Sequence, residues 1–416
     1  MKTKNHLMII ASLFLILPIH AHAYFLKEEN IFVSVDNPIL IYSEKDLRMI
    51  GNDEEWSLDK HYILMNDIVL SPPVAGFANW SPIATGDMYF TGIFDGNNKT
   101  ISRIHIRDNS FQTASFFGNT RNAEIKNLNL IDIQLYLIET KEIGGIASKN
   151  MAGVITNCHV SLNIKSENAQ SYIGGIVSNN TGVISNCSSD GNISGGNYVG
   201  GLVSHNRGLI EYSYSKVNID TKGFAGGLAA WALPSSSASE SKSLIKNSYS
   251  TGDIFGNACA GGIVGYMLLN FGAIRDCYST SIVGTKDSDI VLVGGIVGQC
   301  DSENIIEKCY FAGELKTTHR TSVYPFRGGI VGACTGDVII RSCFSFLYYA
   351  PIVDGFLDNI VMVDNYVLRY EENLSKNEIT KELLSSKKIY EQVGWDFSSE
   401  NPTWFFDKET GFPKLV

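Results

Sequence analysis

Apolar segments along this chain are short, and seven of them contain a pair of adjacent glycines. The pairs recur at spacings of 30, 26, 26, 35, 33 and 34 residues. Repetition at such a period indicates a stack of similar units, each of which buries its apolar face against the next. The glycine doublets are Gly144-Gly145, Gly174-Gly175, Gly200-Gly201, Gly226-Gly227, Gly261-Gly262, Gly294-Gly295 and Gly328-Gly329.

Within one unit, apolar pieces of four to six residues alternate with turns rich in Asn, Gly and Asp, and no helical period fits. Three such pieces follow one another in the unit that begins at Tyr172. Each piece is too short to find a partner within its own unit, so we expect it to pair with the same piece of the next unit. The pattern therefore predicts an all-β chain folded as a parallel β-helix with three sheets and about eight or nine coils.

The first 23 residues have a different pattern. Lys2 and Lys4 precede an apolar stretch, Leu7–Pro18, which is too short to span a bilayer, and Ala21-His22-Ala23 resembles a cleavage site. These features predict a cleaved signal peptide and a secreted, periplasmic or cell-surface product. No later run of 18 or more apolar residues occurs, so the sequence predicts no transmembrane segment.

Both ends of a solenoid must be covered, because open sheet edges invite self-association. A short helix is predicted from Ser43, the N-cap, to Ile50, and a second over Glu378–Val393. The aromatic tail that follows is expected to seal the core. The chain thus divides into a signal peptide (1–23), an N-terminal cap with the first coils (24–110), a repeat region (111–371) and a C-terminal helical and aromatic cap (372–416).

The glycine doublets are costly, since Gly in a strand loses about 0.5–1 kcal/mol relative to Ala. Either they adopt φ values that other residues avoid, or they allow another backbone to approach closely. A phosphate-binding loop would instead open a helix. We therefore interpret the doublets as scaffold positions.

Two columns of stacked side chains are predicted from the register. Asn150, Asn180 and Asn206 lie five positions past their second glycine and should form an amide ladder, and Cys300 and Cys334 share that slot. The residues of a second slot are small and are expected to point inward. Its cysteines are expected to be free thiols, because Cβ atoms stacked ~4.8 Å apart are too far apart for a disulfide. Its members are Cys158, Cys187, Ser213, Ser248, Cys277, Cys309 and Cys343.

Composition narrows the range of partners. Hydrophobic residues make up 44% and charged residues 18%, which is typical of a folded chain. The formal net charge is −10 and no Lys/Arg cluster is evident along the sequence, which argues against nucleic acid and anionic membranes. No C-x-x-C motif occurs, so no metal site and no cofactor are expected.

Three features of the repeat units together resemble the GLUG repeat. They are the doublet followed by Ile or Leu, Val and Gly, a later segment like Asn-Cys-Tyr-Ser, and a final segment like Gly-Asp-Ile. Trp80–Ile83, Phe90–Asn97 and Gly394–Phe397 match its style, and the resemblance covers roughly residues 40 to 416. That repeat occurs in bacterial surface proteins, including non-catalytic regions of IgA-specific metallopeptidases. It implies a right-handed β-helix in a secreted or surface protein, often an adhesin. The peptidases' His-Glu-x-x-His motif is absent, so their chemistry is not carried over.

Insertions are where a ligand site would be added to such a scaffold. Trp231 opens the insertion after Gly227 and either stacks on a sugar or folds over the solenoid. His319 and Tyr324 lie in a second insertion. The favoured function is a non-catalytic binding or adhesion protein, with a polysaccharide, a glycan or a host or cell-surface protein as partner.

The alternative function is a carbohydrate-active enzyme, either a polysaccharide lyase or a glycoside hydrolase. Glycosidases need two carboxyl groups about 5–9 Å apart, which one or two coil rises would supply. The candidate pairs are Asp190 with Asp220 and Asp253 with Asp276. All but Asp276 also lie in turn-like contexts, where Asp is favoured for local hydrogen bonding.

Overall fold

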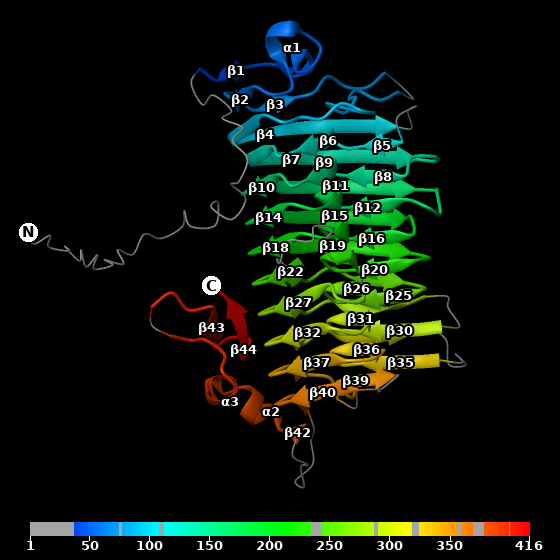
Figure 1. Ribbon diagram of the computed structural model, residues 1–416, viewed down its shortest axis with the longest axis vertical. Helices are drawn as coiled ribbons and strands as arrows, with labels where there is room; N and C mark the ends of the chain where they lie inside the picture. Colours follow the sequence, from blue (N-terminus) through cyan, green and yellow to red (C-terminus); the bar gives the residue numbers. More distant parts are fainter. Residues whose placement is uncertain are drawn as a thin grey trace, which may run out of the picture.

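The computed structural model describes residues 37–74, 77–107, 112–234, 243–286, 290–317, 324–348, 350–355, 359–368, 378–398 and 400–416. The described chain winds into a parallel β-helix with three parallel sheets, as the repeat pattern predicts (Figure 1). One short antiparallel hairpin, β43 (Trp404–Asp407) with β44 (Phe412–Leu415), lies beside the stack.

Two of the sheets contain one strand from each coil. Sheet C has eight strands: β5 (Thr113–Ala114), β8 (Glu142–Gly144), β12 (Tyr172–Gly174), β16 (Tyr198–Gly200), β20 (Phe224–Gly226), β25 (Cys259–Gly261), β30 (Ile290–Gly294) and β35 (Tyr324–Gly328). Sheet B has nine strands: β6 (Phe117–Arg121), β9 (Ala147–Met151), β13 (Val177–Asn180), β17 (Val203–Asn206), β21 (Ala229–Ala232), β26 (Val264–Met267), β31 (Val297–Cys300), β36 (Val331–Cys334) and β39 (Val353–Gly355).

Sheet A is the widest, because most coils contribute two or three strands to it. Its strands are β1 (Ile39–Ile41), β2 (His61–Leu64), β3 (Ile68–Val69), β4 (Ile93–Arg107), β7 (Glu124–Leu137), β10 (Val154–Thr156), β11 (His159–Ser166), β14 (Val183–Ser185), β15 (Ser188–Gly195), β18 (Leu209–Glu211), β19 (Tyr214–Thr221), β22 (Ser243–Lys246), β23 (Tyr249–Ser250), β24 (Ile254–Gly256), β27 (Gly272–Arg275), β28 (Tyr278–Ser279), β29 (Ile282–Thr285), β32 (Asn304–Glu307), β33 (Tyr310–Phe311), β34 (Glu314–Thr317), β37 (Val338–Arg341), β38 (Phe344–Ser345), β40 (Ile360–Val363), β41 (Tyr366–Leu368) and β42 (Glu378–Ile379).

A left-handed residue turns each coil within sheet A. It stands directly before the inward Cys or Ser slot, as at Asn157 (φ 53°) and Asn186 (φ 52°). Asn tolerates this conformation better than most residues, which explains the recurring Asn-Cys pair. Tyr212 and Lys308 adopt the same conformation elsewhere in the stack, so the backbone path is kept even where the favoured residue is absent.

The glycine doublets form the corner between sheets C and B. None of the fourteen doublet glycines, all within the described ranges, has a positive φ. A Cβ on Gly174 would lie 1.9 Å from the Val177 carbonyl oxygen, and one on Gly175 would lie 2.0 Å from the oxygen of Gly201 in the next coil. Close backbone approach, and not an unusual φ, therefore explains the doublets.

The predicted inner columns are present. Asn150 donates to Asn180 over 2.9 Å, and Asn180 donates to Asn206 over 2.8 Å. Cys300 and Cys334 occupy the same register further along the stack. All eight cysteines are free and buried, as predicted.

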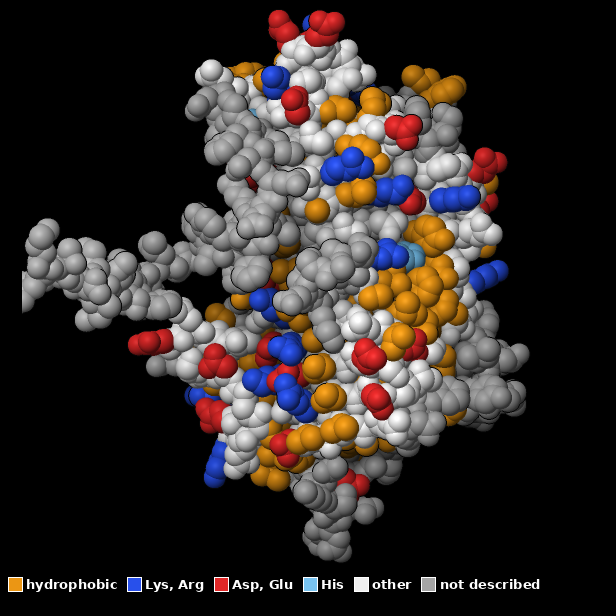
Figure 2. All heavy atoms as spheres, in the orientation of Figure 1, with side chains coloured by type: hydrophobic (Ala, Val, Ile, Leu, Met, Phe, Trp, Pro, Cys, Tyr) orange, Lys and Arg blue, Asp and Glu red, His pale blue; other side chains and the backbone are white. Residues whose placement is uncertain are grey.

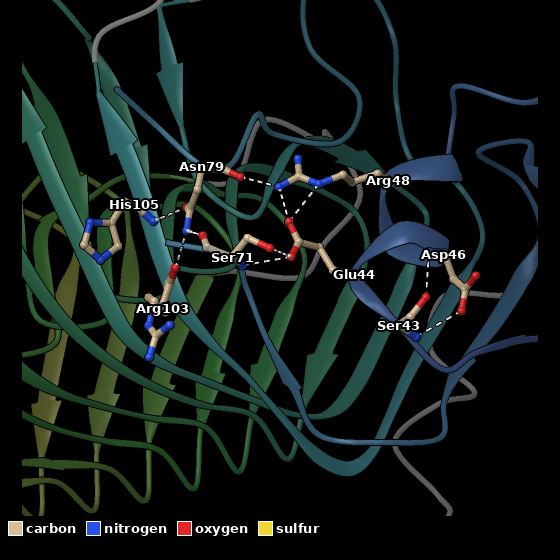
Figure 3. A network of polar contacts seen from close by, with 8 residues as sticks. All are labelled: Ser43, Glu44, Asp46, Arg48, Ser71, Asn79, Arg103 and His105. Carbon is tan, nitrogen blue, oxygen red and sulfur yellow. Dashed lines mark hydrogen bonds and ion pairs between the residues drawn. The ribbon is translucent and has the colours of Figure 1, made fainter. Parts of the chain in front are cut away.

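The N-terminal end is covered by helix α1 (Glu44–Met49), followed by a 3₁₀ turn at Glu54–Trp56. Ser43 and Asp46 form the predicted capping box. Glu44 accepts hydrogen bonds from Ser71, and Arg48 donates to the Asn79 carbonyl oxygen (Figure 3). The Asn79 side chain bonds the backbone of β4, so this network attaches the cap to the first long strand.

The C-terminal end differs from the prediction in two ways. The single helix expected over Glu378–Val393 is instead strand β42 and two short helices, α2 (Lys381–Leu384) and α3 (Lys387–Gln392), because the chain breaks at Ser385-Ser386. The aromatic tail packs against the side of the stack and not over its core: Trp404 donates to Asp276, and Tyr310 donates to the Pro413 carbonyl oxygen.

Candidate functional site

A group of aromatic side chains lines the outer corner between sheets C and B. The corner brings together the residue two positions before each doublet and the residue four positions after it. We call this group the aromatic column; Figure 2 shows hydrophobic side chains gathered on this face. Its members are Tyr172, Tyr198 and Phe224 from sheet C and His205, Trp231 and Tyr266 from sheet B.

The rings of the column stack along the solenoid. Tyr198 lies 4.7 Å from Trp231 and 5.1 Å from Phe224, with interplanar angles of 15° and 6°. Tyr172 begins the column 5.4 Å from Tyr198 and is partly exposed. The column is therefore a rigid apolar surface, because each ring is held by the rings of neighbouring coils.

His205 lies at the centre of the column as a neutral imidazole. Its ring is 4.8 Å from Tyr172 and 5.3 Å from Trp231. Burial lowers the pKa of His205 to about 3, with a smaller contribution from the charge of Arg207. His205 therefore serves as a packed ring at neutral pH.

A polar pocket of about 420 Å³ opens at the Tyr172 end of the column. Glu142 and Lys149 form an ion pair of 2.9 Å across it. They lie one coil before Tyr172 and Asn179, at the same positions of sheets C and B. The pocket thus has an aromatic wall and charged hydrogen-bonding groups. Its lining is Gly86, Gln112, Thr113, Asn119, Lys141, Glu142, Lys149 and Tyr172.

Asn119 lines this pocket and has an unused, buried acceptor. The side chain is 4% exposed, and its amide nitrogen donates to the Gly86 carbonyl oxygen over 2.9 Å. Its Oδ1 is buried and has no hydrogen-bond partner among the residues that the structure describes. A buried acceptor without a partner costs about 1–3 kcal/mol, which a ligand hydroxyl at this position would relieve.

The sequence-predicted binding residues fall in different places. Trp231 lies in the aromatic column, half-buried between Tyr198 and Tyr266. His319 lies outside the described residues. Tyr324 begins β35 in register with Ile290, far along the stack from Trp231.

The predicted carboxylate pairs are not brought together by the register. Asp190 lies opposite Lys216, whereas Asp220 lies opposite Ser194. Four residues along a strand correspond to ~13 Å, which exceeds the ~5–9.5 Å separation that glycosidases use. Asp190 instead accepts from Ser161 over 2.8 Å and lies 3.1 Å from His159 Nε2.

The second pair is also separated. Asp276 turns toward the C-terminal hairpin and accepts from Trp404 over 3.1 Å. Burial raises the pKa of Asp276 above the ordinary carboxyl value. Asp253 is exposed in the turn before β24, and its backbone N–H donates to Asn218. Among the residues that the structure describes, no three His, Cys, Asp or Glu side chains gather to hold a metal ion.

Sequence reasoning missed most of this site. Aligning the units at their doublets would have shown Tyr172, Tyr198 and Phe224 in one column. The sheet B members of the aromatic column, and the pocket, depend on the angle between sheets C and B at the doublet corner. The sequence pattern does not specify that angle. Asn119 precedes the first doublet, so the repeat gives no signal for it.

Comparisons with known proteins agree with the repeat. The GLUG motif matches residues 169–194. The chain therefore contains a GLUG repeat. Halomucin from Haloquadratum walsbyi (strain DSM 16790 / HBSQ001) is 30% identical over 161 residues, which cover 37% of this chain and 2% of halomucin. A crystal structure of a candidate immunoglobulin A1 protease from Bacteroides ovatus aligns over 92% of this chain and 93% of its own, at 20% identity and a TM-score of 0.43.

The matched GLUG repeat contributes Tyr172 to the aromatic column and Asn180 to the inner amide ladder. The repeat therefore carries both a scaffold residue and a surface residue of the candidate site. No helix in the described ranges is long and apolar enough to cross a membrane.

Proposed function

We propose that this GLUG-repeat protein is a surface or secreted binding protein that holds a neutral carbohydrate in the polar pocket, against the ring of Tyr172. The observation that carries the proposal is a buried acceptor, Asn119 Oδ1, which has no partner within the described ranges and belongs to a residue that lines a pocket with one aromatic wall. The GLUG repeat and the likeness to halomucin support the surface or secreted location.

The pocket chemistry suits a polyhydroxyl ligand. A sugar ring offers an apolar C–H face to an aromatic wall and hydroxyl groups to surrounding polar atoms. Tyr172 supplies the wall, Asn119 and Glu142 supply acceptors, and Lys149 supplies a donor. Sites that combine apolar walls with a few placed polar groups are typical of small-ligand binding.

The test is binding of neutral glycans, first by array and then by calorimetry on the strongest hit. We expect Tyr172→Ala and Asn119→Ala each to weaken binding at least ~10-fold, equivalent to ~1.4 kcal/mol. Trp231→Ala should weaken it less, because Trp231 acts through the column and does not line the pocket.

The matched control is Tyr214→Ala. Tyr214 is partly exposed and stacks on Tyr249 at 4.9 Å, but on sheet A. Its removal should leave binding unchanged. The proposal is wrong if no neutral glycan binds, or if the Tyr172 and Tyr214 variants bind equally well.

The carbohydrate-active enzyme remains the alternative, with less support. Asp190 contacts His159 and Ser161 across strands, in positions typical of sheet stabilisation. A depolymerisation assay on the bound glycan distinguishes the two functions. Turnover that Asp190→Asn abolishes would favour the enzyme.

A further inference from the structure

A second, larger groove lies on the outer face of sheet A, away from the aromatic column. Its volume is about 1040 Å³. It crosses β4, β7, β11 and β15, and Pro72 and Pro73 form one wall. Amide side chains follow one register along its floor: Gln134, Asn163 and Asn192, with Asn192 donating to Asn163 over 2.9 Å.

The charge of the groove is opposite to that of the chain. The chain has 33 Lys and Arg against 43 Asp and Glu. The groove lining has three cations, Arg103, Arg107 and Lys165, against one carboxylate, Asp132. Lys165 is paired with Glu167 at 3.4 Å, but neither arginine has a carboxylate partner among the described residues.

A backbone irregularity lies in the same groove. Arg103 (φ 64°) and Asp132 (φ 54°) face each other on β4 and β7 in the left-handed conformation. Ile131 and Asp132 together oppose only Ser161 on β11, which is a β-bulge. A positive φ is uncommon for Arg, and bulges are over-represented beside functional sites, where they redirect a side chain.

The Arg103 segment is also held in place from outside the sheet. Asn79 donates to the Arg103 carbonyl oxygen over 2.7 Å and accepts from the His105 N–H over 2.7 Å (Figure 3). Four residues further along β4, Arg107 lies over the Tyr136 ring, 5.8 Å from its centroid. Both arginines are exposed on ordered backbone, so they offer preplaced positive charge to a ligand.

We infer that this groove is a second binding site and that it takes an anionic polysaccharide, whose carboxylate or sulfate groups pair with Arg103 and Arg107 while its hydroxyl groups bond the amide row. The coil rise of ~4.8 Å repeats the amide row along the axis, so the site suits an extended chain. It is separate from the proposed neutral-carbohydrate pocket and shares no lining residue with it.

The experiment uses the full chain with three polymers: polygalacturonate, dextran sulfate and unmodified dextran. We expect the first or second to bind, and affinity to fall as salt is raised, because exposed charges are screened. The double variant Arg103→Gln, Arg107→Gln should lose at least ~10-fold in affinity for that polymer. Preference between the first two polymers distinguishes carboxylate from sulfate recognition.

The matched control is the double variant Lys216→Gln, Lys222→Gln, which removes two exposed cations outside the groove. It should bind as the parent chain does. Failure of both anionic polymers to bind, or equal losses in the two double variants, would overturn the inference. Neutral-glycan binding at the Tyr172 pocket should be unchanged in both, so the two proposals fail independently.

Discussion

At the scale of single residues, positions inside the solenoid are set by the coil above and the coil below. The doublet glycines show this for backbone, since a Cβ on Gly227 would lie 1.9 Å from the Gly262 carbonyl oxygen. The amide ladder shows it for side chains. Asn180 accepts from Asn150, donates to Asn206 and accepts from the Gly182 N–H, all in the interior.

We therefore expect Asn180→Ala to destabilise the protein by about 2–4 kcal/mol, because one N–H of Asn150 and one lone pair of Asn206 Oδ1 would each lose a hydrogen bond in the interior, although each group keeps a second bond. The matched control is Asn192→Ala, which removes two similar amide–amide bonds, of 2.9 Å to Asn163 and 3.1 Å from Asn218, on the exposed face. Water can replace these bonds, so their loss should cost under ~1 kcal/mol. Urea unfolding of both variants measures the difference. Equal losses would mean that the ladder has no special role.

His205 makes a pH-dependent contribution to stability. Its pKa is about 3 in the folded chain, against an ordinary value of 6.5, mainly because of burial. Between these values the unfolded chain binds a proton that the folded chain does not. The contribution of His205 is therefore complete above pH 6.5 and is lost as the pH falls toward 3.

Compared with His205→Asn, the parent chain should lose stability over that range by up to ~1.4 kcal/mol per pH unit. Denaturant unfolding of both proteins at several pH values between 3.5 and 7 gives the difference directly. Parallel stability curves for the two proteins would show that the imidazole becomes protonated inside the folded column.

At the scale of elements, the caps differ in how far the sequence predicts them. Helix α1 was predictable because the Ser43 and Asp46 capping box is local. The position of the C-terminal hairpin was not predictable. Its partners Tyr310 and Asp276 lie 103 and 128 residues earlier in the chain, and the hairpin itself contains no repeat that would point to them. A cap is attached by contacts that occur once, so periodicity carries no information about them.

Asn79 is one of several contacts that join the N-terminal region to β4, and it also links β4 to helix α1 through Arg48. Asn79→Ala removes its bonds to Ser71, Arg103 and His105, and we expect a loss of about 1–3 kcal/mol. Hydrogen exchange of the β4 amides should accelerate, while that of β26 should stay unchanged because each coil contacts only its neighbours. Asn129→Ala is the control, since its amide makes only bonds of 3.4 and 3.5 Å.

At the scale of the whole molecule, the period indicated the stack, the inner columns and the turn positions, because these recur in every coil. It did not indicate which outer faces hold the two proposed ligand sites. The aromatic column needs two ladders brought together by a corner, and the groove on sheet A needs the left-handed residues of β4 and β7 and the bulge where β7 meets β11. The groove depends on a departure from the repeat, and the column depends on how two repeated positions meet in space, so recurrence along the sequence places neither of them.

A whole-coil deletion tests the view that the molecule is a stack of exchangeable units. Removing Gly174–Val199 deletes 26 residues and joins Ile173 to Gly200, which occupies the register position of Gly174. Asn150 would then meet Asn206 and restore the amide ladder. We expect a folded β-helix, shorter by one coil and by one aromatic ring of the column, which keeps the lining of the polar pocket. Deleting only Cys187–Val199 removes 13 residues, including β15 and most of β16, and would place the sheet B strand β17 where the sheet A strand β15 belongs. That variant should aggregate or lose its β-sheet circular dichroism, because a shift of half a coil leaves apolar faces and ladder groups unpaired around the whole turn. If both deletions fold equally well, stacking register does not determine the fold.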